Sequence, residues 1–254
     1  MNPAGKVYFI GAGPGDPELI TVKGLNIIKQ ADLIIYAGSL VPGQLFENCE
    51  AQRIIDSSGL TLEQTHALMT EACSQNWITA RVHTGDPSIF GTIHEQAALL
   101  QKHNIPFEII PGVTAAFAAA ARAGVCFTLP GINQSLIITR APGRTRVPPS
   151  QDLEKMAATG SSIAVYLSAT LAESVESKLL KGGLDRQTSV IIGWKVGWPD
   201  EVIIKTSLEK LALTVKERNI SGQAVFLILP GSKEGQRSKL YHPGFSHKFR
   251  QSDS

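Results

Sequence analysis

Residues 81–91, Arg-Val-His-Thr-Gly-Asp-Pro-Ser-Ile-Phe-Gly, are the stretch on which the interpretation of the fold depends. A β-prone run from Trp77 to His83 stops at Gly85-Asp86-Pro87, and a helical pattern follows over residues 92–103. This order places backbone amides, a carboxylate and an apolar pair at the carboxyl end of a strand, where open α/β sheets bind ligands. A plain Asx-Pro turn is the alternative interpretation, since Asp and Pro are ordinary turn residues.

Two other loops of similar character follow predicted strands in the first half of the chain. The strand 7–10 runs into GAGPGDP at 11–17 before a helix, and the strand 107–110 runs into PGVTA at 111–115. An Ala-rich helix over 115–123 then ends at Gly124, a natural C-cap. With a further strand at 33–36, strand and helix alternate along this half, which predicts a mainly parallel sheet.

The second half of the chain has a different pattern, which predicts a mixed sheet. Strands are expected at 135–139, 163–167, 190–196, 202–205 and 224–229. Only residues 197–201 separate two of these strands, too few for a crossover helix, so the two should be antiparallel. We therefore predict an α/β protein with an N-terminal domain at 1–128, a C-terminal domain at 129–240 and a polar tail at 241–254.

The composition is that of an ordinary globular protein, with 43% hydrophobic and 18% charged residues among 254. A formal net charge of +2 is too small to indicate a nucleic-acid or anionic-membrane partner. Three widely spaced cysteines, Cys49, Cys73 and Cys126, indicate reduced thiols and not a disulfide framework or a zinc site. Neither a signal-peptide pattern nor a long apolar window is present. We therefore expect a cytoplasmic protein with no membrane partner.

The glycine loop at 11–17 does not match the common nucleotide-binding fingerprints. Asp16 occupies the third glycine position, Asp32 precedes the second strand instead of ending it, and no Gly-Lys-Ser/Thr follows. Six histidines lack metal-ligand spacing, and no serine nucleophile elbow or activated cysteine pattern occurs. We therefore expect no metal and no catalytic side chain. Transfer of an activated methyl group suits such a chain, because orientation of the two reactants supplies most of the acceleration.

A basic loop follows the predicted strand 135–139. It contains Arg140, Arg144 and Arg146 among glycine and proline residues. A solvated loop with no ligand is one interpretation. The other is a lid that pairs with the carboxylates of an anionic substrate, a task suited to the fork of the guanidinium group.

Four motifs together resemble a known family, the S-adenosylmethionine-dependent methyltransferases of corrin biosynthesis. They are IGAGPGDPELITVKG at 10–24, ADLIIYAGSLV at 31–41, TGDPSIFG at 84–91 and PGVTA at 111–115. The match keeps the family's order over nearly the whole chain. YAGSLV, TRAPGRTRVP at 139–148 and GWPDE at 197–201 are most similar to the branch that methylates C-11 of precorrin-4 or of its cobalt form.

The resemblance implies two unequal α/β/α domains, with the cofactor S-adenosyl-L-methionine in the cleft between them, S-adenosyl-L-homocysteine as product, and a homodimer. By matching position, the family's cofactor contacts fall on Pro14, Thr84, Gly85, Asp86, Ile89, Thr114, Ala115 and Leu167, and less directly on Val196. Precorrins carry many acetate and propionate groups, so an anionic tetrapyrrole becomes the expected partner of Arg140, Arg144 and Arg146. The uroporphyrinogen methylases have an acidic residue where this chain has Ala37, which argues against that substrate and against a shared general base.

Two other functions stay open at this point. A relative with the same fold could methylate RNA or a protein side chain, which predicts a broader basic surface than a net charge of +2 supports. A tetrapyrrole carrier would need no sulfonium pocket, so the three matched loops count against it. Cofactor titration followed by a methyl-transfer assay distinguishes the three functions.

Overall fold

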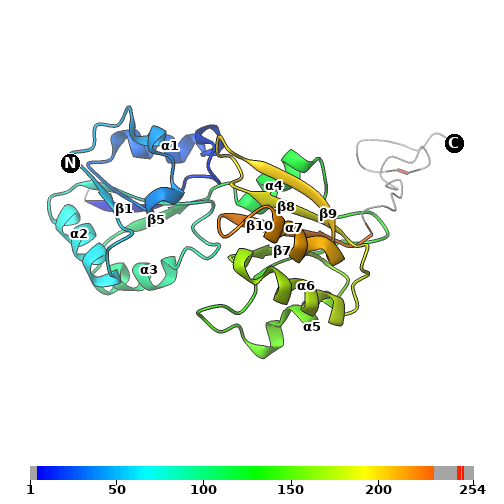
Figure 1. Cartoon of the computed structure of the whole chain (residues 1–254). Coiled ribbons are helices and arrows are strands. Elements are labelled where there is room, and N and C mark those ends of the chain that lie inside the picture. The colour runs from blue at the N-terminus through cyan, green and yellow to red at the C-terminus, as the bar shows by residue number, and fades with distance from the viewer. Residues whose placement is uncertain (1–4, 232–244, 247, 249–254) are drawn as a thin grey trace. The chain divides into compact units, whose positions relative to one another are not determined.

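The computed structural model describes residues 5–231, 245, 246 and 248, and within them the chain forms two compact units (Figure 1). The first unit runs up to Ala118 and also contains Lys195–Asp200, while the second contains the other described residues. The domains at 1–128 and 129–240 stay a prediction. The predicted tail at 241–254 lies outside the described residues, apart from 245, 246 and 248.

The first unit is built on a five-stranded parallel sheet in the order β3-β2-β4-β1-β5, which confirms the predicted parallel pattern. The strands are β1 (Lys6–Gly11), β2 (Leu33–Tyr36), β3 (Arg53–Asp56), β4 (Ile78–His83) and β5 (Phe107–Ile110). The helices are α1 (Val22–Gln30), α2 (Leu62–Ser74), α3 (Ile93–Lys102) and α4 (Ala115–Ala123), and 3-10 turns cover Pro17–Leu19, Gly38–Leu40 and Gly43–Phe46.

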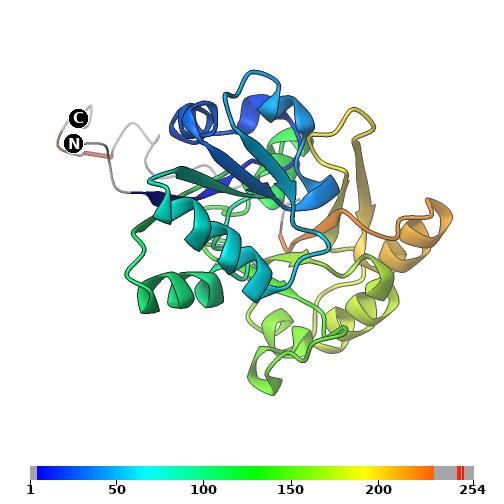
Figure 2. The same cartoon turned by 90° about the vertical axis from the view of Figure 1, so that its left-hand side faces the viewer.

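Both faces of this sheet are buried, as is usual for a parallel sheet with helices on both sides. Figures 1 and 2 show α1 on one face and α2 and α3 on the other. Along β1, Phe9 packs in one core with Met69 of α2 and Leu100 of α3, whereas Ile10 packs in another with Ile28 of α1. Because successive side chains point to opposite faces, two buried faces explain why the run Val7–Ile10 is hydrophobic without alternation.

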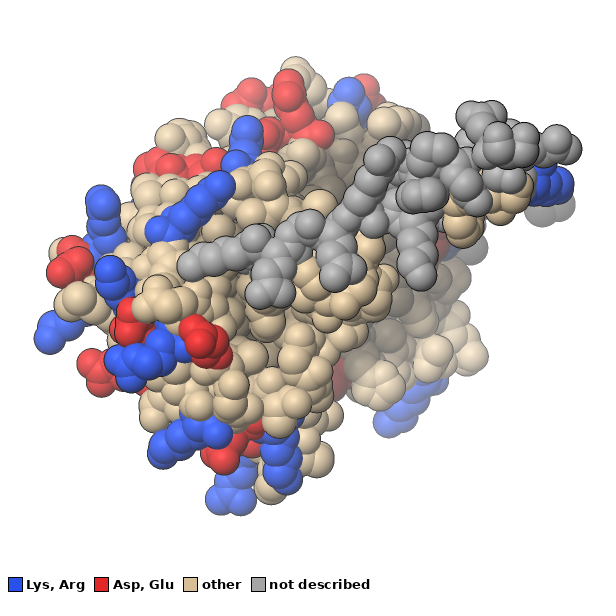
Figure 3. Space-filling model, turned by 90° about the vertical axis from the view of Figure 1, so that its right-hand side faces the viewer, with Lys and Arg blue, Asp and Glu red and all other residues tan. Residues whose placement is uncertain are grey.

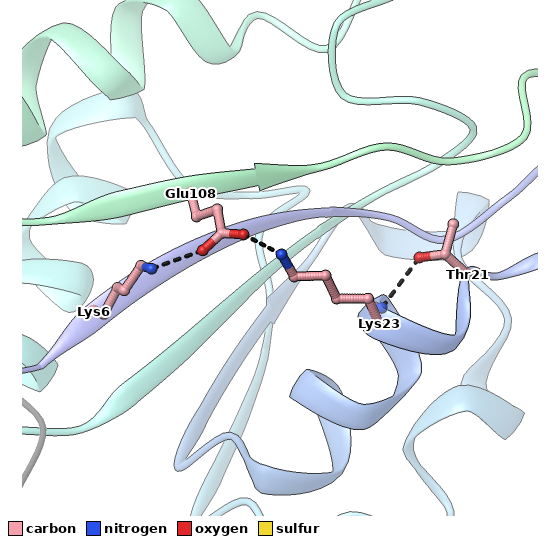
Figure 4. Close-up of polar contacts among 5 residues, drawn as sticks. Lys6, Thr21, Lys23 and Glu108 are labelled. Atoms are coloured by element: carbon pink, nitrogen blue, oxygen red, sulfur yellow. Dashed lines mark hydrogen bonds and ion pairs between the residues drawn. The ribbon is translucent and has the colours of Figure 1, made fainter.

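Three charged side chains fasten α1 to the edge of this sheet (Figure 4). Glu108 of β5 accepts a hydrogen bond from Lys6 of β1 at 2.7 Å and another from Lys23 of α1. Hydrogen bonds from Lys23 and then Lys6 lower the pKa of Glu108 to about 2. The Thr21 hydroxyl caps the same helix by accepting from the Gly24 amide at 3.1 Å. These charges therefore position a helix, and none of them belongs to the predicted site.

The second unit is built on a mixed five-stranded sheet in the order β6-β7-β10-β8-β9, as predicted. Its strands are β6 (Leu136–Arg140), β7 (Ser162–Tyr166), β8 (Ser189–Trp194), β9 (Val202–Ser207) and β10 (Ala224–Leu229). Among the strand pairs described in this second sheet, β6 and β7 are parallel, and the other three pairs are antiparallel. The helices are α5 (Leu153–Ala157), α6 (Ala172–Lys181) and α7 (Leu211–Glu217), with 3-10 turns at Pro149–Gln151, Ala169–Leu171 and Leu208–Lys210. Leu153, Leu179 and Leu211, one from each helix, pack in one core with Phe226 of β10.

Strand β8 ends two residues earlier than the sequence pattern predicts, for a local reason. Lys195 has a φ of +51°, far from the range of a β-strand. The Trp198 amide donates to the Lys195 carbonyl at 2.9 Å and closes a turn there. The connection between β8 and β9 is still too short for a crossover helix, and the two strands are antiparallel as expected.

Candidate functional site

Three loops meet at the carboxyl edge of the first sheet, because parallel strands end at the same edge. The loops after β1 and β4 pair through their backbones: the Gly13 amide donates to the Gly85 carbonyl at 3.3 Å, and the Gly85 amide donates to the Gly13 carbonyl at 2.7 Å. The loop after β5 lies against the same point, since a Cβ atom on Gly112 would stand 2.1 Å from the Gly85 oxygen. The glycines at 85 and 112 are therefore required, the first by a φ of +62° and the second by the close approach of two backbones.

Asp86 connects two of these loops through both oxygens of its carboxylate. Oδ1 accepts from the Ser88 amide at 2.8 Å and from the Ser88 hydroxyl, and Oδ2 accepts from the Gly112 amide at 2.9 Å. Burial works to raise the pKa of Asp86, but these hydrogen bonds together leave the pKa below its ordinary value. The Asx turn considered from the sequence is thus present, and the carboxylate also holds the loop after β5. Oδ2 retains a second acceptor position for a ligand.

The other predicted cofactor contacts of the first unit lie in these loops, at the start of α4, or in the segment Lys195–Asp200. The half-buried ones are Thr84, Ile89 and Ala115, and the buried ones are Pro14, Thr114 and Val196. Together with Gly85 and Asp86, eight of the nine predicted cofactor contacts lie in the first unit, Val196 through the segment Lys195–Asp200. Residues far apart in the sequence are thus collected in one compact unit.

Leu167, the ninth predicted cofactor contact, lies in the second unit just after β7. Its φ of +52° is unusual for a leucine, and its exposed fraction is 69%. Buried Ser168 supports this conformation, because its hydroxyl donates to the Tyr166 carbonyl at 2.6 Å and accepts from the Ala141 amide at 2.8 Å. Strained residues of this kind cluster at ligand contacts, which agrees with the role that the resemblance implies.

The three arginines of the basic loop differ in what they contact. Arg140 is the last residue of β6, and its guanidinium donates to the carbonyls of Ala141, Thr145 and Arg146 at 3.2, 3.1 and 2.9 Å. Arg144 and Arg146 are exposed. Arg140 therefore braces its own loop, while the cationic groups of Arg144 and Arg146 are accessible to a ligand.

Strand β4 carries a buried cation and a buried histidine just before the Thr84 loop. Arg81 donates to Gln96 Oε1 at 3.1 Å and to the Ile35 carbonyl at 3.3 Å, and burial lowers its pKa to about 10. His83 is 5% exposed, and its Nε2 atom has no hydrogen-bond partner among the described residues. Burial, with a smaller contribution from the charge of Arg81, lowers the pKa of His83 to about 3. His83 is therefore neutral at physiological pH.

Within residues 5–231, 245, 246 and 248, no group of three or more His, Cys, Asp or Glu side chains could hold a metal ion. Cys49 and Cys73 are half-buried and Cys126 is exposed, and burial raises the pKa of the Cys73 thiol. On the face that Figure 3 displays, basic and acidic side chains are interspersed. No helix in the described part of the chain is both long enough and apolar enough to cross a membrane.

Sequence reasoning missed one residue beside these loops, Trp198. Its indole Nε1 donates to the Pro14 carbonyl at 3.1 Å. The GWPDE motif at 197–201 was informative only as a point of resemblance, and periodicity gives no signal for a contact between residues 184 positions apart. An aromatic residue between glycine and proline in a short strand connection is the feature that could have directed attention to it.

The chain matches the family of tetrapyrrole (corrin/porphyrin) methylases over residues 6–212. It is 41% identical over 253 residues to a cobalt-precorrin-4 C(11)-methyltransferase of Priestia megaterium, with 96% of this chain and 97% of that protein covered. It is also 41% identical over 247 residues to a precorrin-4 C(11)-methyltransferase of Pseudomonas aeruginosa, with 96% and 98% covered.

Solved structures give the same result. The X-ray structure of a cobalt precorrin-4 methyltransferase, a cobalamin biosynthetic enzyme, has a TM-score of 0.86 and 40% identity, and the match covers 88% of this chain and 94% of that one. A uroporphyrin-III C-methyl transferase from Thermus thermophilus complexed with S-adenyl homocysteine has a TM-score of 0.74 at 24% identity, with 90% and 93% covered, which shows a shared fold. Sequence and fold agree, and the chain belongs to the tetrapyrrole (corrin/porphyrin) methylases.

Proposed function

We propose that this protein transfers a methyl group from S-adenosyl-L-methionine to C-11 of precorrin-4 or cobalt-precorrin-4 in cobalamin biosynthesis, with release of S-adenosyl-L-homocysteine. The observation that carries the proposal is the 41% identity, over nearly the full length of both chains, to two relatives that bear these names. The TM-score of 0.86 to a cobalt precorrin-4 methyltransferase supports it.

The carboxyl edge of the first sheet fits such a cofactor. Beside the backbone of Gly85 there is open space, since an added Cβ would meet nothing nearer than the Thr114 Cα at 3.8 Å. A ligand can therefore approach this peptide closely, while Asp86 and Thr84 offer polar side-chain atoms on either side of it in the sequence. We propose that Thr84, Gly85 and Asp86 hold polar groups of the cofactor, and that Ile89 lies against an apolar part.

The remaining predicted contacts keep their proposed roles on separate grounds. Thr114 and Ala115 lie at the start of α4, next to the loop that Asp86 holds through Gly112. Leu167 is supported by its exposed side chain and its strained backbone. Pro14 and Val196 are buried, so we propose that they act through backbone atoms and through the shape of their loops.

Alignment, and not side-chain chemistry, is the proposed contribution of the enzyme. When bound, the cofactor supplies a methyl group on a positively charged sulfur, and the electron-rich macrocycle supplies the attacking carbon. The Gly13–Gly85 and Asp86–Gly112 hydrogen bonds fix the loops beforehand, so that less ordering remains to be done on binding. Orientation of two reactants can lower a barrier by up to roughly 7–11 kcal/mol. No side chain of this chain is proposed as a nucleophile.

The basic loop is proposed to recognise the substrate. Arg144 and Arg146 are exposed and can pair with acetate and propionate groups of the tetrapyrrole. Arg140 was predicted to act with them, but three of the hydrogen bonds of its guanidinium go to loop carbonyls. We therefore propose that Arg140 contributes chiefly by ordering the loop.

We also propose that the protein works in the cytoplasm as a homodimer. Free cysteines suit a reducing compartment, and the family resemblance implies the dimer. Light scattering of the purified chain tests the second point, because a monomer has a mass of 27.3 kDa and a dimer twice that.

The test of the proposed function is a methyl-transfer assay with a cofactor labelled at the methyl carbon. Precorrin-4, cobalt-precorrin-4 and uroporphyrinogen III are offered in separate reactions, and the products are analysed by mass spectrometry and carbon NMR. We expect one added methyl group, with the label at C-11, on one or both precorrin-4 forms. Because Ala37 replaces the acidic residue of the uroporphyrinogen methylases, uroporphyrinogen III should stay unmodified. Methylation of uroporphyrinogen III alone would contradict the proposal.

A further inference from the structure

The segment Lys195–Asp200 leaves the sheet of the second unit and belongs to the first unit. Its shape is set locally. Lys195 has a φ of +51° and Gly197 a φ of +82°, the Trp198 amide donates to the Lys195 carbonyl at 2.9 Å, and the Lys195 ammonium pairs with the Asp200 carboxylate. The segment is therefore a compact turn with its own hydrogen bond and ion pair.

This turn packs closely on the glycine loop that follows β1. The Trp198 indole Nε1 donates to the Pro14 carbonyl at 3.1 Å. A Cβ atom on Gly15 would lie 2.5 Å from the indole ring, and one on Gly197 would lie 2.6 Å from the Asp16 amide nitrogen. Both glycines are thus needed for the two segments to approach, and the indole covers the backbone at Gly15.

The glycine loop is consequently held from two directions. The backbones of Gly13 and Gly85 are hydrogen-bonded to each other just after β4. The Pro14 carbonyl accepts a hydrogen bond from the Trp198 indole. Proline has no amide hydrogen and a fixed φ. With its carbonyl also bonded, the peptide between Pro14 and Gly15 has little freedom left.

We propose that Trp198 is a positioning residue for the cofactor: it fixes the Pro14–Gly15 peptide and thereby sets the affinity for S-adenosylmethionine and its product. This inference rests on the proposed function, because it assumes that the glycine loop lies at the cofactor site. It assigns Trp198 no contact with the reacting atoms. Trp198 affects the binding of the cofactor, whereas the basic loop affects the binding of the tetrapyrrole.

The first experiment compares Trp198→Phe with Trp77→Phe. Phenylalanine keeps a ring against Gly15 but lacks the indole N–H, whereas Trp77 lies just before β4, at the opposite end of that strand from the Thr84 loop. Calorimetric titration with S-adenosylhomocysteine should show an affinity about two- to tenfold weaker for Trp198→Phe, the range that one neutral hydrogen bond spans. Trp77→Phe should bind like the unaltered protein. In the methyl-transfer assay the KM for the cofactor should rise in Trp198→Phe, with the KM for the tetrapyrrole unchanged.

The second experiment uses the indole as its own reporter. The chain contains three tryptophans, so a Trp77→Phe/Trp194→Phe double variant emits only from Trp198. Its emission should change on titration with S-adenosylhomocysteine and saturate at the calorimetric Kd. Gly15→Ala, which places a methyl group against the indole, should weaken binding further than Trp198→Phe, with thermal melting used to confirm that each variant is folded.

The outcomes separate the inference from the function on which it rests. If the unaltered protein does not bind S-adenosylhomocysteine, the proposed function itself is wrong. If it binds, but folded Trp198→Phe binds equally well and the emission of Trp198 does not respond, Trp198 is only a packing residue and the inference is overturned.

Discussion

Replacing His83 by leucine should remove a large part of the acid sensitivity of folding. In the folded protein burial holds the pKa of His83 at about 3, whereas the pKa of an unfolded histidine is about 6.5. The folded state therefore binds this proton less readily than the unfolded state does. The stability that neutral His83 contributes is fully present above about pH 6.5, and it is lost as the pH falls from there toward about 3.

The size of the effect follows from that difference. A single such group changes the free energy of unfolding by about 1.4 kcal/mol for each pH unit. At about pH 5 the unaltered protein should thus have lost roughly 2 kcal/mol relative to neutral pH through His83 alone. His66 acts in the same direction, because burial and the neighbouring His103 lower its pKa. That contribution remains in the variant, so the difference between the two proteins isolates His83.

Urea unfolding followed by circular dichroism, at a series of pH values from 7.5 to about 5, measures this difference. His94→Ala is the matched control, since His94 is exposed on α3, and its unfolding should follow the pH dependence of the unaltered protein. The leucine variant also removes an Nε2 atom that has no partner among the described residues, so it should be at least as stable as the unaltered protein at pH 5. The difference in free energy of unfolding between the two proteins should change with pH. If that difference changes by less than about 0.5 kcal/mol between pH 7.5 and about 5, the reasoning is refuted.

Further predictions concern the cofactor loops, the basic loop and the course of the methyl transfer. Asp86→Ala should weaken cofactor affinity beyond any loss of folding, because both the Ser88 turn and the bond to Gly112 disappear; equal affinity in a folded variant, measured by calorimetry, would exclude that role. Arg144→Gln/Arg146→Gln should raise the KM for the tetrapyrrole roughly tenfold to a hundredfold, the effect of a charged hydrogen bond, and spare cofactor affinity; unchanged kinetics in this double variant would mean that the loop is only a solvated surface. Arg140→Lys keeps the charge but not the three carbonyl contacts, so it should also speed tryptic cleavage of the loop. A chiral methyl group should arrive inverted at C-11, since direct transfer is expected, and retention would reveal a methylated enzyme; turnover should stay within a few-fold when serine replaces Cys49, Cys73 and Cys126.

The fold was predictable wherever the signal was local. Hydrophobic or β-prone runs that stop at glycine and proline predicted the loops after β1, β4 and β5, and alternation with helices predicted the parallel sheet. The short connection after β8 gave its antiparallel pairing with β9. Each of these inferences needs only the order of residue types, because strand length, helix period and loop length are all written along the chain.

The side-chain partners within the site were not predictable in this way. From the sequence, Asp86 was equally a ligand contact and a turn residue, and the structure shows its carboxylate bonded to Ser88 and Gly112. Arg140 was grouped with its neighbours by charge, but its position at the end of β6 directs its guanidinium to its own loop. Which donor reaches which acceptor depends on backbone geometry set by distant strands, so residue order alone does not reveal it.

Asp86, Arg140 and Trp198 use their polar groups in the same manner: each bonds to the backbone of its own or a neighbouring loop. Such bonds fix loop geometry before a ligand arrives, and they leave the side chains little part in bond making. That arrangement suits a reaction in which the cofactor supplies the electrophile and the substrate the nucleophile, so that the enzyme needs mainly to orient them. Substitutions at these three positions should therefore appear chiefly in Kd and KM values, and in kcat only as far as alignment is lost. A change in the pH dependence of kcat on substitution of Asp86 would instead indicate that its carboxylate takes part in proton transfer.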